Sequence, residues 1–294
     1  MMPRVLTLVL ITAAYCEQSA TGLSDDEIKK SMSSTNLMDV EYAQIPEGLV
    51  IDGINDFDHR GRTPLMNACE VGFLKAVIQL LRGGADSNLH SRQGMNETAL
   101  HFASLRGFDG VVMALLERGN LAVDALTAIN DTALFIAAQA GHPNVVVTLL
   151  KAGASLQAFR VDKITPLHIA ALNGRSTVVD IILKHAAESK PSLISALTDG
   201  GESVIRLAII SGNVDVIRLL LENGADPNAS RGSPKEYSPL IEAAIRDHEE
   251  IVEILLLHGA VVDHKDRFGH NALHHAIEND SQNVISILNT VKSG

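Results

Sequence analysis

The sequence predicts an all-α solenoid of stacked helix–turn–helix units with β-hairpin fingers. Three observations support this prediction: a short capped helix recurs at a nearly fixed spacing, a second apolar helix follows each copy, and aromatic residues are scarce. Only 3% of the 294 residues are aromatic and none is Trp, although 46% are hydrophobic. Small aliphatic side chains suit a row of narrow interfaces between repeats better than one large central core.

Residues 1–16 have the layout of a secretory signal peptide. A short basic start precedes an apolar run over 5–14, and residues 14–16 offer a small-x-small cleavage site. The run is too short to span a bilayer, so we expect no stable membrane insertion. We expect a secreted or periplasmic protein whose mature chain begins near Glu17. A lipoprotein is disfavoured by Tyr15, and the alternative is an apolar N-terminal helix that caps the stack of a cytoplasmic protein.

Residues 17–50 form an acidic, polar lead-in before the repeats, which we place at 51–294. We expect a linker with one helix over 25–38 that caps the first repeat. The chain has a formal net charge of −11, and nine acids against two lysines between 25 and 58 supply most of it. An acidic chain without a basic stripe argues against nucleic acid or an anionic membrane as the main partner.

The motif that organises the chain is Thr165-Pro166-Leu167-His168. Thr165 is a good N-cap because its hydroxyl accepts a hydrogen bond from a backbone N–H of the first helical turn. Pro166 fits the first helical position, where its missing N–H costs nothing. Apolar residues at 167, 170 and 171 share one face, and 173–174 ends the helix. A helix this short is not stable alone in water, so it must pack on neighbours of the same kind.

Seven copies of this motif are present, and their N-cap positions are 33 to 38 residues apart, at 63, 98, 132, 165, 203, 238 and 271. Residues 178–183 are typical of the second apolar helix, and residues 219–228 read LLLENGADPN. A period near 33 with a T-P-L-H-x-A core and this ending resembles the ankyrin repeat. The resemblance covers residues 51–294 and implies a non-enzymatic, monomeric module that binds a protein or peptide partner.

Glycines are expected at both turns of each repeat. Those between the paired helices are at 72, 107, 141, 174 and 212, with Asp247 and Asp280 in the last two copies. Those that end the second helices are at 84, 119, 153, 224 and 259, where a left-handed residue is needed. In repeat four Ala186 replaces this Gly, and the following segment has five residues beyond the period. We expect a lengthened finger there, with or without a kink in the second helix.

No pattern in the sequence indicates catalysis or a cofactor. Residues 201–205 begin like a nucleophile elbow, but Ile205 occupies the position of the closing Gly, and Ser203 already serves as a helix cap. The two cysteines, Cys16 and Cys69, provide no disulfide framework. Cys69 takes an Ala position of the first short helix, so we expect a buried thiol.

The densest group of histidines is near the end of the chain, at His264, His270, His274 and His275. Neither a Cys nor a carboxylate is evident at metal-ligand spacing, so the sequence predicts no metal there. The resemblance implies a structural role for the histidines of the motif, which are His101, His168 and His274. A metal or enzymatic site near His264–His275 remains the alternative from another functional class.

In proteins of this family, partners usually contact the hairpin tips and the concave face of the short helices. Two positions before each helix-ending turn are expected to face that side. Among the five central repeats, the first position holds Leu105, Leu172, Ile210 and Ile245, where a solvated helix prefers polar residues. This apolar row predicts an interaction site; the alternative is that each residue packs on the next repeat as core. The predicted partner-binding residues are Glu70, Val71, Met95, Leu105, Arg106, Gln139, Leu172, Asn173, Ile210, Tyr237, Ile245, Arg246 and Phe268.

Overall fold

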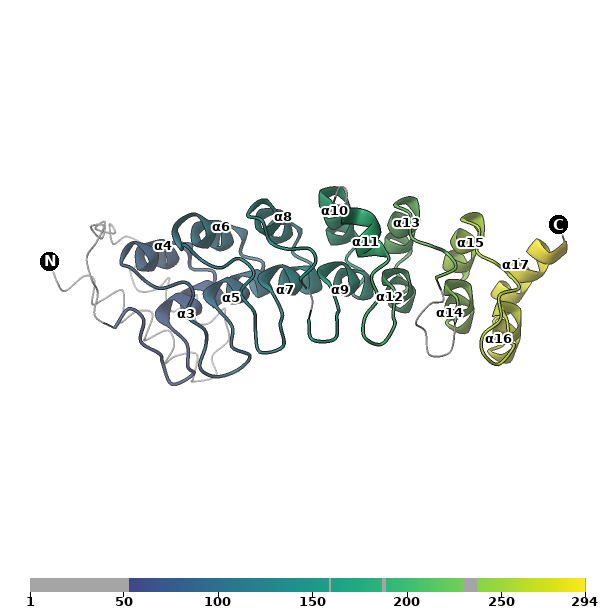
Figure 1. The fold of residues 1–294 in the computed structure, drawn as a ribbon, viewed down its shortest axis with the longest axis horizontal. Helices are drawn as coiled ribbons and strands as arrows, with labels where there is room; N and C mark the ends of the chain where they lie inside the picture. The colour runs from purple at the N-terminus through teal and green to yellow at the C-terminus, as the bar shows by residue number, and fades with distance from the viewer. Residues whose placement is uncertain (1–52, 159, 187–188, 230–236, 294) are drawn as a thin grey trace, which may run out of the picture. The chain divides into compact units, whose positions relative to one another are not determined.

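The computed structural model describes residues 53–158, 160–186, 189–229 and 237–293 (Figure 1). The predicted signal peptide and lead-in lie outside these ranges. The all-α prediction is confirmed: the described residues form helices and turns without a strand, and one isolated β-bridge joins Leu197 to Ser203. The chain divides into two compact units, residues 1–133 with 151–153 and residues 134–150 with 154–294.

In the first unit, helices pack in pairs that stack side by side (Figure 1). Helix α3 contacts both α4 and α5, and α6 contacts both α4 and α5. The short helices α3 and α5 form one layer, called the inner layer here, and α4 and α6 form the outer layer. Their bounds are Pro64–Glu70 for α3, Leu74–Arg82 for α4, Ala99–Arg106 for α5 and Asp109–Arg118 for α6.

The second unit has the same arrangement of paired helices within itself. From α9 onward, neighbouring inner helices contact one another, and so do neighbouring outer helices. The inner helices are α7 (Ala133–Ala140), α9 (Pro166–Leu172), α12 (Val204–Ser211), α14 (Pro239–Ile245) and α16 (Ala272–Glu278). The outer helices are α8 (Pro143–Lys151), α10 (Ser176–Ala186), α13 (Val214–Glu222), α15 (Glu249–Leu257) and α17 (Gln282–Ser293), and a short extra helix, α11 (Lys190–Ile194), follows α10.

The predicted caps begin the inner helices. The hydroxyls of Thr63, Thr165, Ser203 and Ser238 accept from the backbone N–H three residues later, and the Asn271 side chain does the same. The residue two positions after each cap is the core anchor of its repeat. From repeat one to repeat six this anchor is at most 2% exposed, at Leu65, Leu100, Leu134, Leu167, Ile205 and Leu240. Burial of such a side chain is worth about 1.5–3 kcal/mol, so the stack is held by many small interfaces.

The turns between paired helices need a left-handed residue, as predicted. The five glycines there have φ between 63° and 84°, and both Asp247 and Asp280 adopt φ 56°. A Cβ on Gly72 would lie 2.7 Å from the Phe108 ring, so this turn also needs Gly for space. The prediction for Gly119 is wrong: its φ is −87°, and Asn120 takes the left-handed conformation with φ 39°. The reason is that the N–H of Gly119 still bonds to the carbonyl of Leu115, so the helix turns one residue later.

The fingers are tight turns. In repeats one, three, four, five and seven, a backbone N–H bonds to the carbonyl four residues later, as from Asp58 to Arg62 and from Asp266 to His270. The lengthened finger predicted for repeat four is absent, because Thr198–Ser203 has the same length as Asp58–Thr63. The additional residues instead extend α10 and form α11, where burial of Leu193 and Ile194 holds them in the helical layers.

Candidate functional site

The predicted partner-binding residues of the first unit lie at the ends of the inner helices and on a finger. Leu105, near the end of α5, is 50% exposed, and Met95, on the finger before α5, is 41% exposed. Arg106 follows Leu105 and is also exposed. Glu70 and Val71, at the end of α3, are half-buried. This unit therefore presents two apolar side chains to solvent at positions where the sequence predicts a partner.

In the second unit, the predicted residues differ in exposure. Phe268, on the last finger, is 58% exposed, and Gln139, Asn173 and Arg246 are exposed. The three members of the apolar row that lie in this unit, Leu172, Ile210 and Ile245, are half-buried. Tyr237 is also half-buried. Each residue of this row thus combines contact with its neighbours and access to solvent.

Carboxylates bridge arginines between neighbouring inner helices, a feature that the sequence analysis did not identify. In the first unit, Glu70 forms ion pairs with Arg62 and with Arg106. In the second unit, Glu242 is only 5% exposed, and its oxygens lie 3.3 Å from Arg206 Nε and 2.9 Å from Arg246 Nη2. A sequence signal exists, since Glu70 and Arg106, like Arg206 and Glu242, have opposite charges 36 residues apart, close to one repeat.

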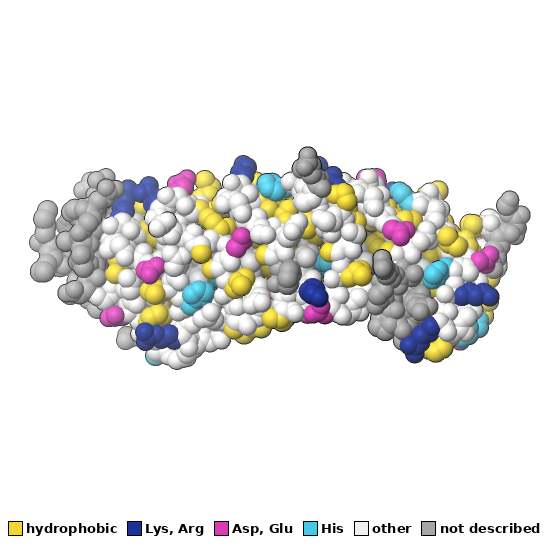
Figure 2. All heavy atoms as spheres, in the orientation of Figure 1, with side chains coloured by type: hydrophobic (Ala, Val, Ile, Leu, Met, Phe, Trp, Pro, Cys, Tyr) yellow, Lys and Arg dark blue, Asp and Glu magenta, His cyan; other side chains and the backbone are white. Residues whose placement is uncertain are grey.

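On the face drawn in Figure 2, basic and acidic side chains of the described residues are interspersed with uncharged ones.

Two motif histidines, His101 and His168, connect one repeat to the next finger. His101 Nδ1 accepts from the N–H of Thr98 at 3.0 Å, so Nε2 carries the proton and donates to the carbonyls of Ala125 and Asp131, both at 3.1 Å. His168 repeats this arrangement with Thr165 and with the carbonyl of Ala196 at 3.2 Å. Burial disfavours the charged ring and lowers the pKa of each histidine from 6.5 to about 4. The structural role predicted for these two residues fits this geometry.

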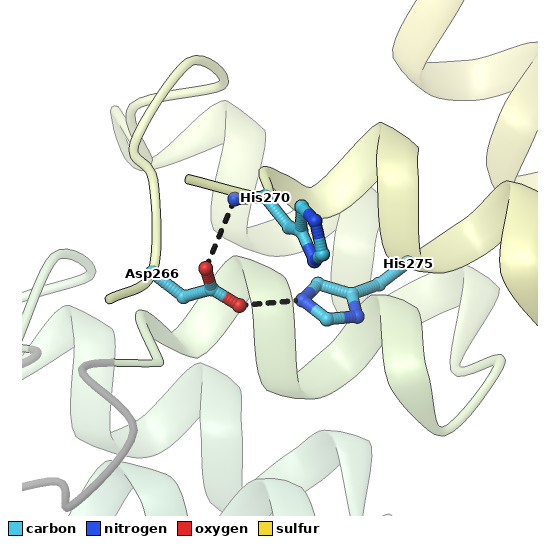
Figure 3. Close-up of side chains that lie close together, drawn as sticks. All are labelled: Asp266, His270 and His275. Atoms are coloured by element: carbon cyan, nitrogen blue, oxygen red, sulfur yellow. Dashed lines mark hydrogen bonds and ion pairs between the residues drawn. The ribbon is translucent and has the colours of Figure 1, made fainter. Parts of the chain in front are cut away.

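The third motif histidine, His274, has a different environment. Its ring stacks on His270 with the centroids 3.8 Å apart, and its Nε2 lies 3.4 Å from Glu278 Oε1. The predicted absence of a carboxylate at ligand spacing is wrong. Asp266, which is only 5% exposed, lies on the finger that carries His270, and its carboxylate accepts a hydrogen bond from His275 Nε2 at 2.9 Å (Figure 3). The sequence spacing does not predict this contact, because Asp266 and His275 meet only when the finger folds back on α16.

The Asp266 carboxylate is also held by the backbone of its own finger. Its Oδ1 accepts from the N–H of Phe268 at 2.8 Å and of His270 at 2.9 Å. Burial raises the pKa of Asp266, but the hydrogen bonds from the His270 N–H, the His275 side chain and the Phe268 N–H outweigh it. The net pKa is therefore lower than the usual value of 3.8, and the side chain is ionised at neutral pH.

Cys69 is fully buried, and this burial raises the pKa of its thiol, so the reactive thiolate is suppressed. Its predicted role as a buried free thiol is confirmed. None of the helices that the structure describes combines the length and the apolar character needed to cross a membrane.

Comparison with known proteins identifies one family throughout the repeats. The family model of ankyrin repeats matches residues 65–160, 156–231 and 230–292. The human transient receptor potential cation channel subfamily A member 1 is 26% identical over 324 aligned residues, which include 92% of this chain but only 29% of that protein. This chain thus spans less than a third of that relative.

Solved structures agree with this identification. The ankyrin repeat domain of human ASB11 is 28% identical with a TM-score of 0.66, and the match covers 76% of this chain and 97% of that domain. The ankyrin repeat domain of Bcl-3 is 26% identical with a TM-score of 0.65, over 77% of this chain and 99% of that domain.

Proposed function

We propose that this chain is a non-enzymatic module that binds a protein or peptide partner. The chain belongs to the ankyrin repeat family. Ankyrin repeats are generally protein–protein interaction modules. The proposed binding surface consists of the exposed inner-helix ends and the finger tips, the side that the sequence predicts to be concave. We propose in addition that the protein is monomeric and that its partner is a protein or peptide and not a nucleic acid.

The exposure of Leu105 carries the proposal. A Leu that is 50% exposed near the end of a helix buries little area in the free protein and gains burial when a partner covers it. The neighbouring Arg106 is oriented by its ion pair with Glu70, which supplies a charged rim. An apolar centre with a polar rim is the usual anatomy of a protein interface.

The second unit supports the proposal in a weaker form. Leu172, Ile210 and Ile245 are half-buried, so each substitution there affects the stack as well as a bound partner. Phe268 and Arg246 are exposed and are better probes of that part of the surface. We place the centre of recognition at the exposed residues and assign the half-buried row a shared role in packing.

The test uses two variants in the same unit with similar exposure. Leu105 lies on the inner helix α5 and is 50% exposed, whereas Met113 lies on the outer helix α6 and is 45% exposed. A partner is first captured with the whole chain and identified, and its affinity for each variant is then measured. Leu105→Ser is expected to weaken binding by about 5- to 30-fold, equivalent to about 1–2 kcal/mol, and Met113→Ser to leave it unchanged.

Thermal unfolding of the same two variants is the control, with a stability loss below about 1 kcal/mol expected for each. A partner that loses affinity for Met113→Ser but not for Leu105→Ser would place the interface on the outer layer and contradict the proposal.

We also propose that the module acts after export, on the basis of the signal-like pattern in residues 1–16. Sequencing the N-terminus of the protein from its natural source tests this proposal. A mature chain that begins near Glu17 is expected. Recovery of Met1 or Met2 would instead favour an adaptor that retains its N-terminus in the cytoplasm.

A further inference from the structure

The finger of repeat seven differs from that of repeat one at the two positions that face its buried carboxylate. Asp58 and Asp266 occupy equivalent positions, five residues before their caps. Asp58 Oδ1 accepts from two backbone N–H groups of its finger, both at 2.9 Å, and its Oδ2 accepts from Asn67 Nδ2 at 3.0 Å. Asp266 repeats all three bonds, but His275 replaces Asn67.

Repeat one therefore shows what the structural role alone requires. An amide at the position of His275 is enough to tie the finger to the inner helix, so an imidazole is not needed for that bond. The residue before the cap also differs, because repeat one has Arg62 where repeat seven has His270. Both changes bring ring nitrogens to the carboxylate that the backbone already holds.

We propose that Asp266, His270 and His275 bind a divalent transition metal ion of the Zn²⁺ type. One ligand atom from each of the three residues lies within 4.8 Å of the other two. Ligand atoms about 2.1 Å from a tetrahedral ion are about 3.4 Å apart, so a modest closure completes the site. Asp266 Oδ2 and His275 Nε2 are 2.9 Å apart, so this pair opens by about 0.5 Å when the ion replaces their hydrogen bond. The half-buried ring of His270 closes on the ion from the third side.

The surroundings of the three ligands favour a fixed site. The buried carboxylate cannot rotate without losing its two backbone hydrogen bonds, so one ligand is held in place before the ion arrives. The rings of Tyr237 and His275 form a T-shaped pair with the centroids 5.4 Å apart, which restrains a second ligand. Glu278 Oε2 lies 3.5 Å from the other nitrogen of His275, and a carboxylate in this outer position orients a ligating imidazole.

The protons can be accounted for without another reactant. A carboxylate only accepts hydrogen bonds, so His275 Nε2 carries the proton in the metal-free arrangement. Coordination through Nε2 requires this proton to leave. In the neutral ring the proton moves from Nε2 to Nδ1, which then donates a hydrogen bond to the Glu278 carboxylate. A ring that starts with both protons releases the Nε2 proton to solvent. Binding is therefore expected to weaken as the pH falls.

Two imidazoles and one carboxylate select the class of ion. Nitrogen ligands suit Zn²⁺, Co²⁺, Ni²⁺ and Cu²⁺, whereas Ca²⁺ and Mg²⁺ prefer sites built from oxygen alone. Three protein ligands leave a fourth position of a tetrahedral ion for water or another donor. A second candidate set, His270, His274 and Glu278, shares His270, so the two sets compete for one ion. His274 and Glu278 are exposed, whereas Asp266 and His275 are buried, so the first set loses less side-chain freedom on binding.

The test measures Zn²⁺ binding to the whole chain, prepared without a polyhistidine tag and stripped with a chelator. Calorimetry and metal analysis of the dialysed protein are expected to give one tightly bound ion per chain. Co²⁺ is expected to give the visible absorption of a four-coordinate site with nitrogen and oxygen ligands. Zn²⁺ is also expected to raise the unfolding temperature, because it binds the folded state.

Repeat one supplies the matched variants. His275→Asn and His270→Arg copy Asn67 and Arg62, so the finger retains a known way to fold, which circular dichroism checks. Each is expected to weaken Zn²⁺ binding by more than about 100-fold, since loss of an outer-shell partner alone costs about 10- to 100-fold. His274→Ala is expected to bind Zn²⁺ as the natural protein does.

Two results would overturn the assignment. One is a natural chain that takes up no stoichiometric Zn²⁺. The other is a site that survives His275→Asn but is lost in His274→Ala, which would move the ion to the exposed set. Neither result bears on the proposed protein partner, because no ligand of the metal site is among the residues that test that proposal.

Discussion

Repeats four and seven carry the same sequence motif but bury it differently. Leu167 and Leu273 both lie two residues after a cap, yet Leu167 is 0% exposed and Leu273 is half-buried. His168 and His274 both lie three residues after a cap, but His168 is 0% exposed and His274 is exposed. The side chain of His168 reaches the next finger at Ala196, whereas the ring of His274 stacks on His270 of its own finger.

This difference shows that the motif determines the position of the inner helix, whereas the neighbouring segments determine the environment of its histidine. The capping residue and the apolar spacing determine where each inner helix begins and which face it buries, and they do so in both repeats. The chemistry of the histidine depends on what packs against it. Beside a following finger it is a neutral structural group, as at His168, whereas at His274 it is an exposed ring that stacks on a histidine of its own finger.

The largest predicted effect tests the packing side of this comparison. Leu167→Ala removes a fully buried side chain from the middle of the second unit and is expected to cost about 2–5 kcal/mol of unfolding free energy. Leu273→Ala makes the same chemical change at a half-buried position and is expected to cost about 1 kcal/mol. Chemical denaturation of both variants measures the two losses.

A control for this pair lies in α11. Pro191 is exposed at the start of that helix, and Pro191→Ala is expected to cost less than about 1 kcal/mol. Equal losses for Leu167→Ala and Leu273→Ala would mean that repeat position alone determines stability and that burial by neighbours adds nothing.

Most of the fold could be predicted from the sequence because its signals are local and repeated. A cap such as Thr165, an anchor such as Leu167 and a turn glycine such as Gly174 act within a few residues, and seven copies reinforce one another. The prediction failed where two local signals compete. Gly119 is followed by Asn120, which also tolerates a left-handed conformation, and the chain uses the second of the two. The residues after Ala186 could extend a finger or a helix, and burial of Leu193 favours the helix.

The candidate sites were less accessible to sequence reasoning, because they depend on contacts between segments. The period predicts that Leu105 and Leu172 occupy equivalent positions, but it does not predict that one is exposed and the other half-buried. The pairing of Arg206 with Glu242 needs the relative rotation of two helices. The contact between Asp266 and His275 needs the path of a finger, and a comparison of Asp58 with Asp266 at equal repeat positions could have suggested it.

A smaller predicted effect tests the chemical side of the comparison, through the pH dependence of stability. The pKa of His101 and of His168 is about 4 in the folded chain and 6.5 as the ordinary value. Between these values the unfolded chain binds more protons, so stability falls as the pH falls from 6.5 towards 4 and is fully present above 6.5. Each histidine is expected to account for a loss of about 2 kcal/mol between about pH 7 and pH 5.

Repeat one again suggests the variant that isolates this effect. Met66 occupies the position of His168, accepts from the N–H of its cap at 3.4 Å and does not titrate. His168→Met is expected to lower stability at neutral pH, because the carbonyl of Ala196 loses its donor, but to remove about 2 kcal/mol of the acid-induced loss. His101→Met is expected to do the same, and the double variant to remove both contributions, because the two histidines share no hydrogen-bond partner.

Urea denaturation at several pH values from about 7 to about 5 measures these differences while most carboxylates stay ionised. Burial also lowers the pKa of His248, but this residue is present in every variant and cancels in the comparison. The ionised Asp58 and Asp266, whose pKa values lie below 3.8, lose their contributions only at lower pH. A His168→Met chain with the same pH dependence as the natural protein would show that the buried ring of repeat four does not titrate on unfolding in this range. The difference between His168 and the histidines of repeat seven would then be a difference in packing alone.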